Sequence, residues 1–135
     1  MARGDRVPLL PTRGVVLVRA SLNGQSGFDL IVDSGASQMV ISRSAASRLG
    51  IDLSKPLRQQ SLIGIGRSAP VPVVRLNRVR VGASEVAGVE ASVYDLPPFL
   101  GAHGLLGLNF LRRFRVTFEF DTDMLILQLP PRKKP

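Results

Sequence analysis

The sequence contains no cysteine, no tryptophan and one histidine among its 135 residues. Without cysteine, the chain cannot form a disulfide, a thiolate metal site or a cysteine nucleophile. A single histidine also excludes most imidazole-based zinc sites and argues against a serine–histidine–aspartate triad. We therefore expect no metal site, and several classes of nucleophilic enzyme are excluded.

Long apolar runs are missing as well, since none approaches the roughly 18 residues that a membrane-spanning helix needs. Near the N-terminus, Arg3 and Arg6 precede a Leu-Leu pair that lies between Pro8 and Pro11, which does not resemble a signal peptide. We expect no membrane segment in this chain, although an excised domain of an anchored protein would look the same. The lack of disulfides leaves the compartment open between cytoplasm and periplasm.

The chain does have enough apolar material for a core, because 44% of its residues are hydrophobic and 21% are charged. Its 13 glycines and 10 prolines are spread between short apolar runs, a pattern typical of short strands joined by tight turns. We expect one mainly β domain at residues 14–129. An N-terminal segment at 1–13 precedes it, and a basic, proline-rich tail at 130–135 follows it.

The net charge of +8 raises the question of a nucleic-acid partner. The tail supplies three of these charges and residues 1–6 supply one, which leaves a mildly basic +4 for residues 7–131. Aromatic side chains that stack on bases are scarce, since the chain has 6 phenylalanines and 1 tyrosine. We interpret the charge as solvated surface and expect no nucleic acid. In the weaker alternative, a basic nucleic-acid binder, the tail would act with Arg75, Arg78, Arg80, Arg112, Arg113 and Arg115.

Periodicity and turn signals predict the order of the elements. Asn23-Gly24 is a strong hairpin signal between two apolar runs, and Gly50 is placed to end a short helix. Residues 121–123 have the composition of a turn between the last two strands. The predicted strands cover 14–22, 28–32, 40–42, 61–65, 71–76, 78–81, 86–93, 115–120 and 124–129, and the predicted helices cover 43–49 and 105–113.

One apolar strand, residues 28–32, leads directly into Asp33, Ser34, Gly35 and Ala36. Such a strand delivers the aspartate to a fixed place, while Gly35 permits a tight turn and the close approach of another backbone. The Ser34 hydroxyl can brace that turn by a hydrogen bond. By itself the tripeptide also fits an ordinary turn, so its interpretation depends on the rest of the chain.

Residues 32–37 resemble the active-site segment of the retropepsin-like aspartic proteases, the single-domain relatives of pepsin. Further along, Leu105, Leu106 and Gly107 are similar to the hydrophobic-hydrophobic-Gly motif that opens the conserved helix of this family. The glycine-bearing hairpin around 61–72 lies where the family keeps its flap, and its candidate substrate-binding residues are Ile63, Gly64, Ile65 and Gly66.

This resemblance implies a β-barrel of the acid-protease type, with one or two short helices and a flap hairpin. It also implies a cofactor-free endopeptidase that binds an extended protein or peptide substrate. The chain has a single such aspartate motif, whereas the family's chemistry uses two carboxylates. A homodimer is therefore implied, in which Asp33 is the catalytic residue of each subunit and Ser34, Gly35 and Ala36 support it.

The chain departs from the retroviral members at two coupled positions. Ser37 and Leu108 stand where those members have an acid and an arginine that pair with each other. Because both charges are absent, neither is left buried without its partner. This pattern fits the cellular and bacterial branch of the family.

Two other titratable residues, Asp29 and His103, are expected to have structural rather than catalytic roles. Asp29 shares the strand parity of Asp33, but we expect it to face solvent rather than act as a second acid. His103 is expected to be a loop or packing residue rather than a group that tunes the site. The alternative function is a catalytically silent module of the same fold that binds peptide or only dimerises.

Overall fold

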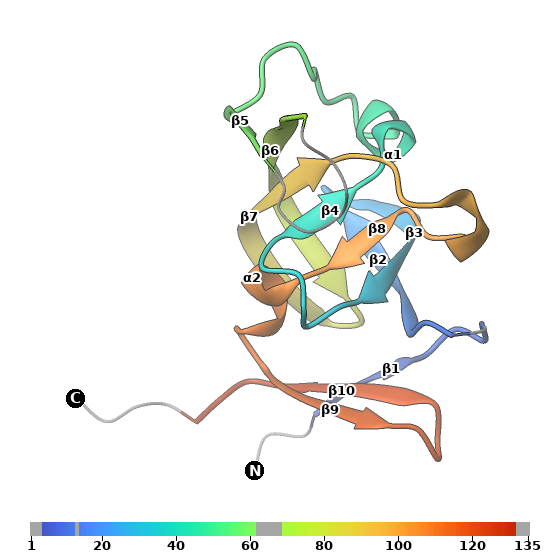
Figure 1. Cartoon of the computed structure of the whole chain (residues 1–135). Helices are drawn as coiled ribbons and strands as arrows, with labels where there is room; N and C mark the ends of the chain where they lie inside the picture. The colour runs from blue at the N-terminus through green and yellow to red at the C-terminus, as the bar shows by residue number, and fades with distance from the viewer. Residues whose placement is uncertain (1–3, 13, 62–68, 132–135) are drawn as a thin grey trace.

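The computed structural model describes residues 4–12, 14–61 and 69–131, and this part of the chain is mostly β-structure (Figure 1). Strands occupy β1 (Asp5–Pro8), β2 (Leu17–Leu22), β3 (Gln25–Val32), β4 (Met39–Ile41), β5 (Arg58–Gln60), β6 (Val71–Val81), β7 (Ser84–Val93), β8 (Gly104–Leu106), β9 (Arg115–Glu119) and β10 (Met124–Gln128). The helices are α1 (Arg43–Arg48), the 3-10 helix η1 (Pro98–Leu100) and α2 (Leu108–Leu111).

Six strands close into a barrel. The sheet has the order β2-β3-β8-β4-β7-β6-β5, and an additional pairing of β2 with β6 closes it and leaves β5 outside the ring. Most neighbours are antiparallel, but β8 runs parallel to β3 and β4 runs parallel to β7. The predicted mainly β barrel with two short α-helices is confirmed.

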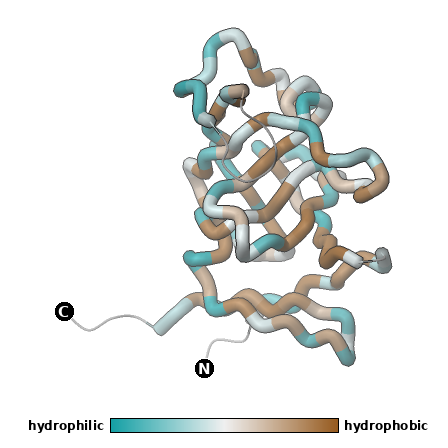
Figure 2. The backbone as a smooth tube through the Cα atoms, in the orientation of Figure 1, coloured by the Kyte–Doolittle hydropathy of each residue, from teal (hydrophilic) through white to brown (hydrophobic). Residues whose placement is uncertain are grey.

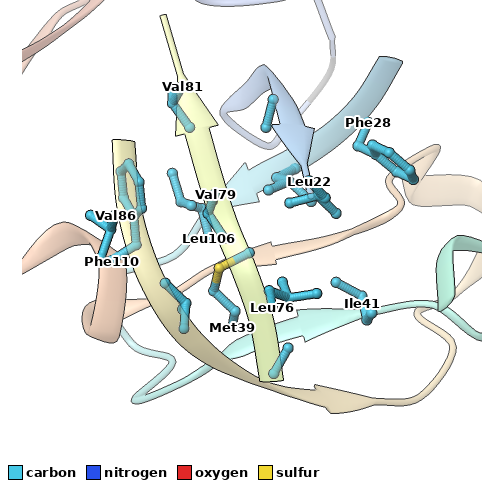
Figure 3. Close-up of a cluster of buried hydrophobic side chains, with 14 of the residues drawn as sticks. Leu22, Phe28, Met39, Ile41, Leu76, Val79, Val81, Val86, Leu106 and Phe110 are labelled. Carbon is cyan, nitrogen blue, oxygen red and sulfur yellow. The ribbon is translucent and has the colours of Figure 1, made fainter. Parts of the chain in front are cut away.

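Alternating side chains of the barrel strands form the core. In β6, Val79 and Val81 are fully buried whereas Arg78 and Arg80 are exposed, which is the period of two expected for a strand with one buried face. Figure 2 shows apolar residues along the inner strands. Figure 3 shows their side chains meeting inside the barrel, where each fully buried large one stabilises the fold by roughly 1.5–3 kcal/mol.

A second, three-stranded sheet has the order β1-β10-β9 and brings the two ends of the described chain together (Figure 1). The sequence did not predict β1. Val7 of β1 and Leu125 and Leu127 of β10 are buried in the main core. The Asp5 carboxylate ties the sheet to the β6–β7 turn, because its Oδ2 accepts hydrogen bonds from the Ala83 N–H and the Ser84 hydroxyl, both at 2.8 Å.

Local turn chemistry was predicted well. Asn23 and Gly24 both have positive φ in the tight β2–β3 hairpin, and Gly50 has φ of +69° just after α1.

The prediction of a helix over 105–113 was wrong at its start, because residues 104–106 form β8 and α2 begins at Leu108. A segment of three residues is too short for its hydrophobic periodicity to show whether it forms a strand or a helix.

Strand β8 lies very close to its neighbours. A β-carbon at Gly104 would collide with the carbonyl group of Val40 in β4, and one at Gly107 would collide with the carbonyl groups of Gln38 and Ala36. Glycine is therefore required at both positions for the backbones to approach each other.

We expect Gly104→Ala to lower the free energy of unfolding by roughly 2–3 kcal/mol, because the added methyl group must displace β4. Urea denaturation measures the change. Gly50→Ala is the matched control: Gly50 has positive φ but open space at its β-carbon position, so only the backbone cost of about 1 kcal/mol applies. Equal losses in the two variants would contradict the close-packing argument.

Candidate active site

Asp33 lies directly after β3, and backbone hydrogen bonds fix its position. Its N–H donates to the Leu106 carbonyl at 3.1 Å, which continues the β3–β8 pairing by one residue. On the other side, the Val32 N–H donates to the Val16 carbonyl at 2.8 Å. The Asp33 side chain is therefore carried by a backbone that is held from both sides.

The turn after Asp33 is closed by the aspartate itself. Its Oδ1 accepts a hydrogen bond from the Gly35 N–H at 2.9 Å, and its carbonyl accepts one from the Ala36 N–H at 3.2 Å. Among the described residues, the hydroxyl of the exposed Ser34 has no hydrogen-bond partner. One carboxylate oxygen is thereby oriented, and the half-buried side chain faces a cleft.

Asn109 of α2 holds the loop at 36–39, which follows the Asp33 turn. No sequence pattern provided a signal for this role. Its Oδ1 accepts a hydrogen bond from the Met39 N–H at 3.0 Å, and its Nδ2 donates to the Glu90 carbonyl in β7 at 2.8 Å. The Leu108 N–H donates to the Ala36 carbonyl at 2.8 Å. The beginning of α2 thus anchors both ends of the loop at 36–39.

A cleft of about 240 Å³ opens beside Asp33. Asp33 is the one charged side chain among the described residues that line it. Ser92, 1% exposed, donates its hydroxyl hydrogen bond to Gln38 Oε1 at 3.1 Å in the wall of this cleft. Sequence reasoning missed this polar wall because the two residues are 54 positions apart. The remaining lining residues are Gly35, Ala36, Ser37, Val40, Gln60, Tyr94 and Leu105.

The second motif is divided between the cleft and the core. Leu105 lines the cleft, whereas the side chain of Leu106 is fully buried in the barrel. This division follows from the alternation of side chains along β8. Gly107 is the residue that lets α2 begin against the loop after Asp33.

The candidate flap residues Ile63, Gly64, Ile65 and Gly66 lie outside the described residues. The strand predicted at 61–65 falls almost entirely in the same interval. Gln60, at the end of β5, and Val71, at the start of β6, are paired with each other at its base.

Asp29 and His103 form a structural pair at the start of the β3–β8 ladder. His103 Nδ1 accepts a hydrogen bond from the Asp29 N–H at 2.9 Å, and the imidazole packs edge-on against Phe28. The Asp29 carboxylate, with 21% of its side chain exposed, pairs with the exposed Arg19 at 2.9 Å. Neither residue lines the cleft beside Asp33. No cluster of acidic and imidazole side chains that could hold a metal ion occurs in the described ranges.

Comparisons with known proteins bear on this site. Residues 18–110 match the family model described as aspartyl protease. A protein of Rickettsia prowazekii (strain Madrid E), described as uncharacterized, is 32% identical over 102 residues, which make up 72% of this chain and 40% of that protein. The chain thus spans well under half the length of this relative.

None of the described helices is long and apolar enough to cross a membrane.

Two solved structures share the fold. The crystal structure of a retropepsin-like aspartic protease from Rickettsia conorii has a TM-score of 0.70 and 26% identity, and the match covers 94% of this chain and 96% of that one. The retroviral protease-like domain of Ddi1 from Leishmania major has a TM-score of 0.58 and 16% identity over 89% and 97% of the two chains. The second likeness supports the fold alone.

We expect Asn109→Ala to lower the free energy of unfolding by roughly 2 kcal/mol, because the Met39 N–H and the Glu90 carbonyl lose their partner. Thermal and urea denaturation measure the change. The control, Asn77→Ala, removes an exposed asparagine from β6 and should stay within about 0.5 kcal/mol of the unmodified chain. A loss at Asn109 no larger than that of the control would show that the loop at 36–39 does not depend on this side chain.

Proposed function

The chain belongs to the aspartyl protease family and has the retropepsin-like fold, and we propose that it is an aspartic endopeptidase with Asp33 as its catalytic residue. The observation that carries this proposal is the placement of the Asp33 carboxylate. It lies at the edge of a cleft whose other described lining residues are all uncharged, and its Oδ1 is oriented by the Gly35 N–H.

Hydrolysis of a peptide bond by water needs both a base and an acid. Asp33 supplies one carboxyl group, and no second one lines the described part of the cleft. The simplest source of the second group is Asp33 of another copy of the chain, related by a two-fold axis. A homodimer therefore follows from the proposed chemistry.

In such a pair, two neighbouring carboxylates share one proton because both cannot be ionised at close range. The ionised Asp33 takes a proton from a water molecule, which attacks the peptide carbonyl carbon. The protonated Asp33 of the other copy donates to the carbonyl oxygen. Collapse of the tetrahedral intermediate breaks the C–N bond as a proton passes to the leaving amine, with no covalent enzyme intermediate.

The substrate proposed for this site is an extended peptide. The cleft wall presents a polar pair, Gln38 and Ser92, beside apolar Val40 and Leu105. An extended chain places alternate side chains into such pockets while its backbone makes hydrogen bonds. Residues 63–66 stay the candidate flap, whose closure over the peptide would exclude bulk water.

We expect Asp33→Asn to abolish cleavage of a diverse peptide mixture, by at least about three orders of magnitude, because an amide cannot act as the base. Mass spectrometry of the products between about pH 4 and 7 measures it and gives the cleavage preference. Asp29→Asn is the matched control. It removes the carboxylate of Asp29 in β3, which pairs with Arg19 outside the cleft. This control should keep its activity.

Cleavage that survives Asp33→Asn undiminished would overturn the protease proposal. Absence of cleavage by the unmodified chain, at concentrations where it is shown to be dimeric, would instead favour the catalytically silent module that binds peptide.

The shared proton also predicts the dependence of kcat/KM on pH. The pair is active with one proton, because two protons remove the base and none removes the acid. We expect a bell-shaped profile between acidic and neutral pH, measured with a cleaved peptide found in the mixture. A profile with a single limb that rises to high pH would argue against a shared proton.

A further inference from the structure

A second hollow, of about 310 Å³, lies between β7 and the end of α2, and we refer to it as the β7 hollow. Its described walls include residues 86–90 of β7, together with Asn109 of α2 and Arg113 just after that helix. The helix packs against β7 through the bond from Asn109 to the Glu90 carbonyl (Figure 1). Gln38 lines both this hollow and the cleft beside Asp33, so the two spaces share one wall.

Strand β7 connects the hollow with the cleft. Glu90 and Ser92 point to the same face of the strand, whereas Ala91 between them is buried in the main core. Glu90 lines the β7 hollow and Ser92 lines the cleft. Glu90 and Gly88 come two and four residues before Ser92, which corresponds to about 7 and 13 Å along a strand. An extended peptide that leaves the cleft along β7 therefore reaches the hollow within two to four residues.

Arginine side chains make this hollow basic. Arg113 is exposed, and it forms no ion pair with any described residue. Arg75 lies over the backbone of Gly88, because a β-carbon at Gly88 would be 2.6 Å from the Arg75 Nη2 atom. Arg58 pairs with Glu90 at 2.7 Å, and this hydrogen bond holds the pKa of the Glu90 carboxyl below its usual value. Three guanidinium groups thus lie at or beside the hollow, and the one carboxylate among them is already paired.

The chemistry of the hollow favours the carboxylate of a peptide as its ligand. A guanidinium group without an ion-pair partner can bind a carboxylate through two parallel hydrogen bonds. No aromatic side chain lines the described part of the hollow, so a nucleic-acid base has nothing to stack on. The adjoining cleft is the one in which a peptide is proposed to bind. These features favour an acidic peptide over a nucleic acid.

We propose that the β7 hollow is a binding site for an aspartate or glutamate side chain of the peptide, with Arg113 as its cationic contact. The inference rests on the proposed function, because the acidic residue belongs to the peptide that the cleft would hold. Next to the scissile bond the same residue would be disfavoured, since Asp33 is negatively charged and no cation lines the described part of the cleft. In a homodimer each copy has one such hollow, so acidic residues could be bound on both sides of the scissile bond.

Affinity selection tests the proposal without catalysis. The full chain carrying Asp33→Asn is incubated with a random library of peptides of about ten residues, which span roughly 33 Å when extended. Mass spectrometry compares the bound and unbound fractions. We expect aspartate and glutamate to be enriched about two- to fivefold in the bound fraction, as for an exposed ion pair. The enrichment should disappear in about 0.5 M salt, which screens such pairs.

Charge reversal shows whether Arg113 is responsible. In the same Asp33→Asn background, we expect Arg113→Glu to abolish the enrichment of acidic residues and to enrich lysine and arginine instead. Arg43→Glu is the matched control, because it changes the net charge equally at an exposed arginine of α1 that lines neither the hollow nor the cleft. This control should keep the enrichment of acidic residues. Glu90→Gln should increase it, because the substitution removes the carboxylate that competes for the arginines.

Reversal of the preference by Arg113→Glu and not by Arg43→Glu supports the inference. The inference is overturned by equal selection in both variants, by selection without acidic residues, by no peptide binding, or by retention of an oligonucleotide in place of acidic peptides. Cleavage that depends on Asp33 but shows no preference for acidic residues keeps the proposed function and loses the inference. Selection that Arg113→Glu reverses, from a chain that cleaves no peptide, keeps the binding site and contradicts the endopeptidase.

Discussion

The close approach of β8 to β4 is the constraint on which the candidate site depends. Gly104 lets the β8 backbone lie against the Val40 carbonyl, and Gly107 lets the next turn lie against the Gln38 and Ala36 carbonyls. Only with β8 in this place can the Leu106 carbonyl accept the hydrogen bond from Asp33 N–H. A larger residue at either glycine would therefore move the aspartate as well as open the barrel.

The environment of Asp33 is built from backbone groups and neutral side chains rather than from charges. Gly35 orients its carboxylate, Asn109 fixes the loop that follows, and Gln38 with Ser92 forms the adjacent wall. No arginine or lysine lines the cleft within the described residues to hold the carboxylate in its ionised form. That arrangement suits the proposed pair of aspartates, since a nearby fixed cation would favour two ionised groups and oppose the sharing of one proton.

How much the sequence could predict depended on how local each signal was. The Asn23-Gly24 hairpin, the glycine after α1 and the final turn are encoded by adjacent residues, and Asp33 directly follows a recognisable apolar strand. Strand β1, in contrast, depends on its pairing with β10, more than a hundred residues later, and on the bonds of Asp5 to the β6–β7 turn. The bonds of Asn109 to residues 39 and 90 are likewise visible only after folding. Short elements such as β8 take their conformation from neighbours distant in sequence, which periodicity does not register.

The apolar face of the terminal sheet changes gradually from core to surface. Leu125 and Leu127 of β10 are buried, and on the same face Val116 and Phe118 of β9 become progressively more exposed toward the free edge. In the proposed homodimer, folding and association would be linked, because a partner that binds only the folded chain stabilises it by mass action. In a chain whose proposed chemistry needs two copies of one carboxylate, this linkage would tie the order of each Asp33 loop to the presence of the other.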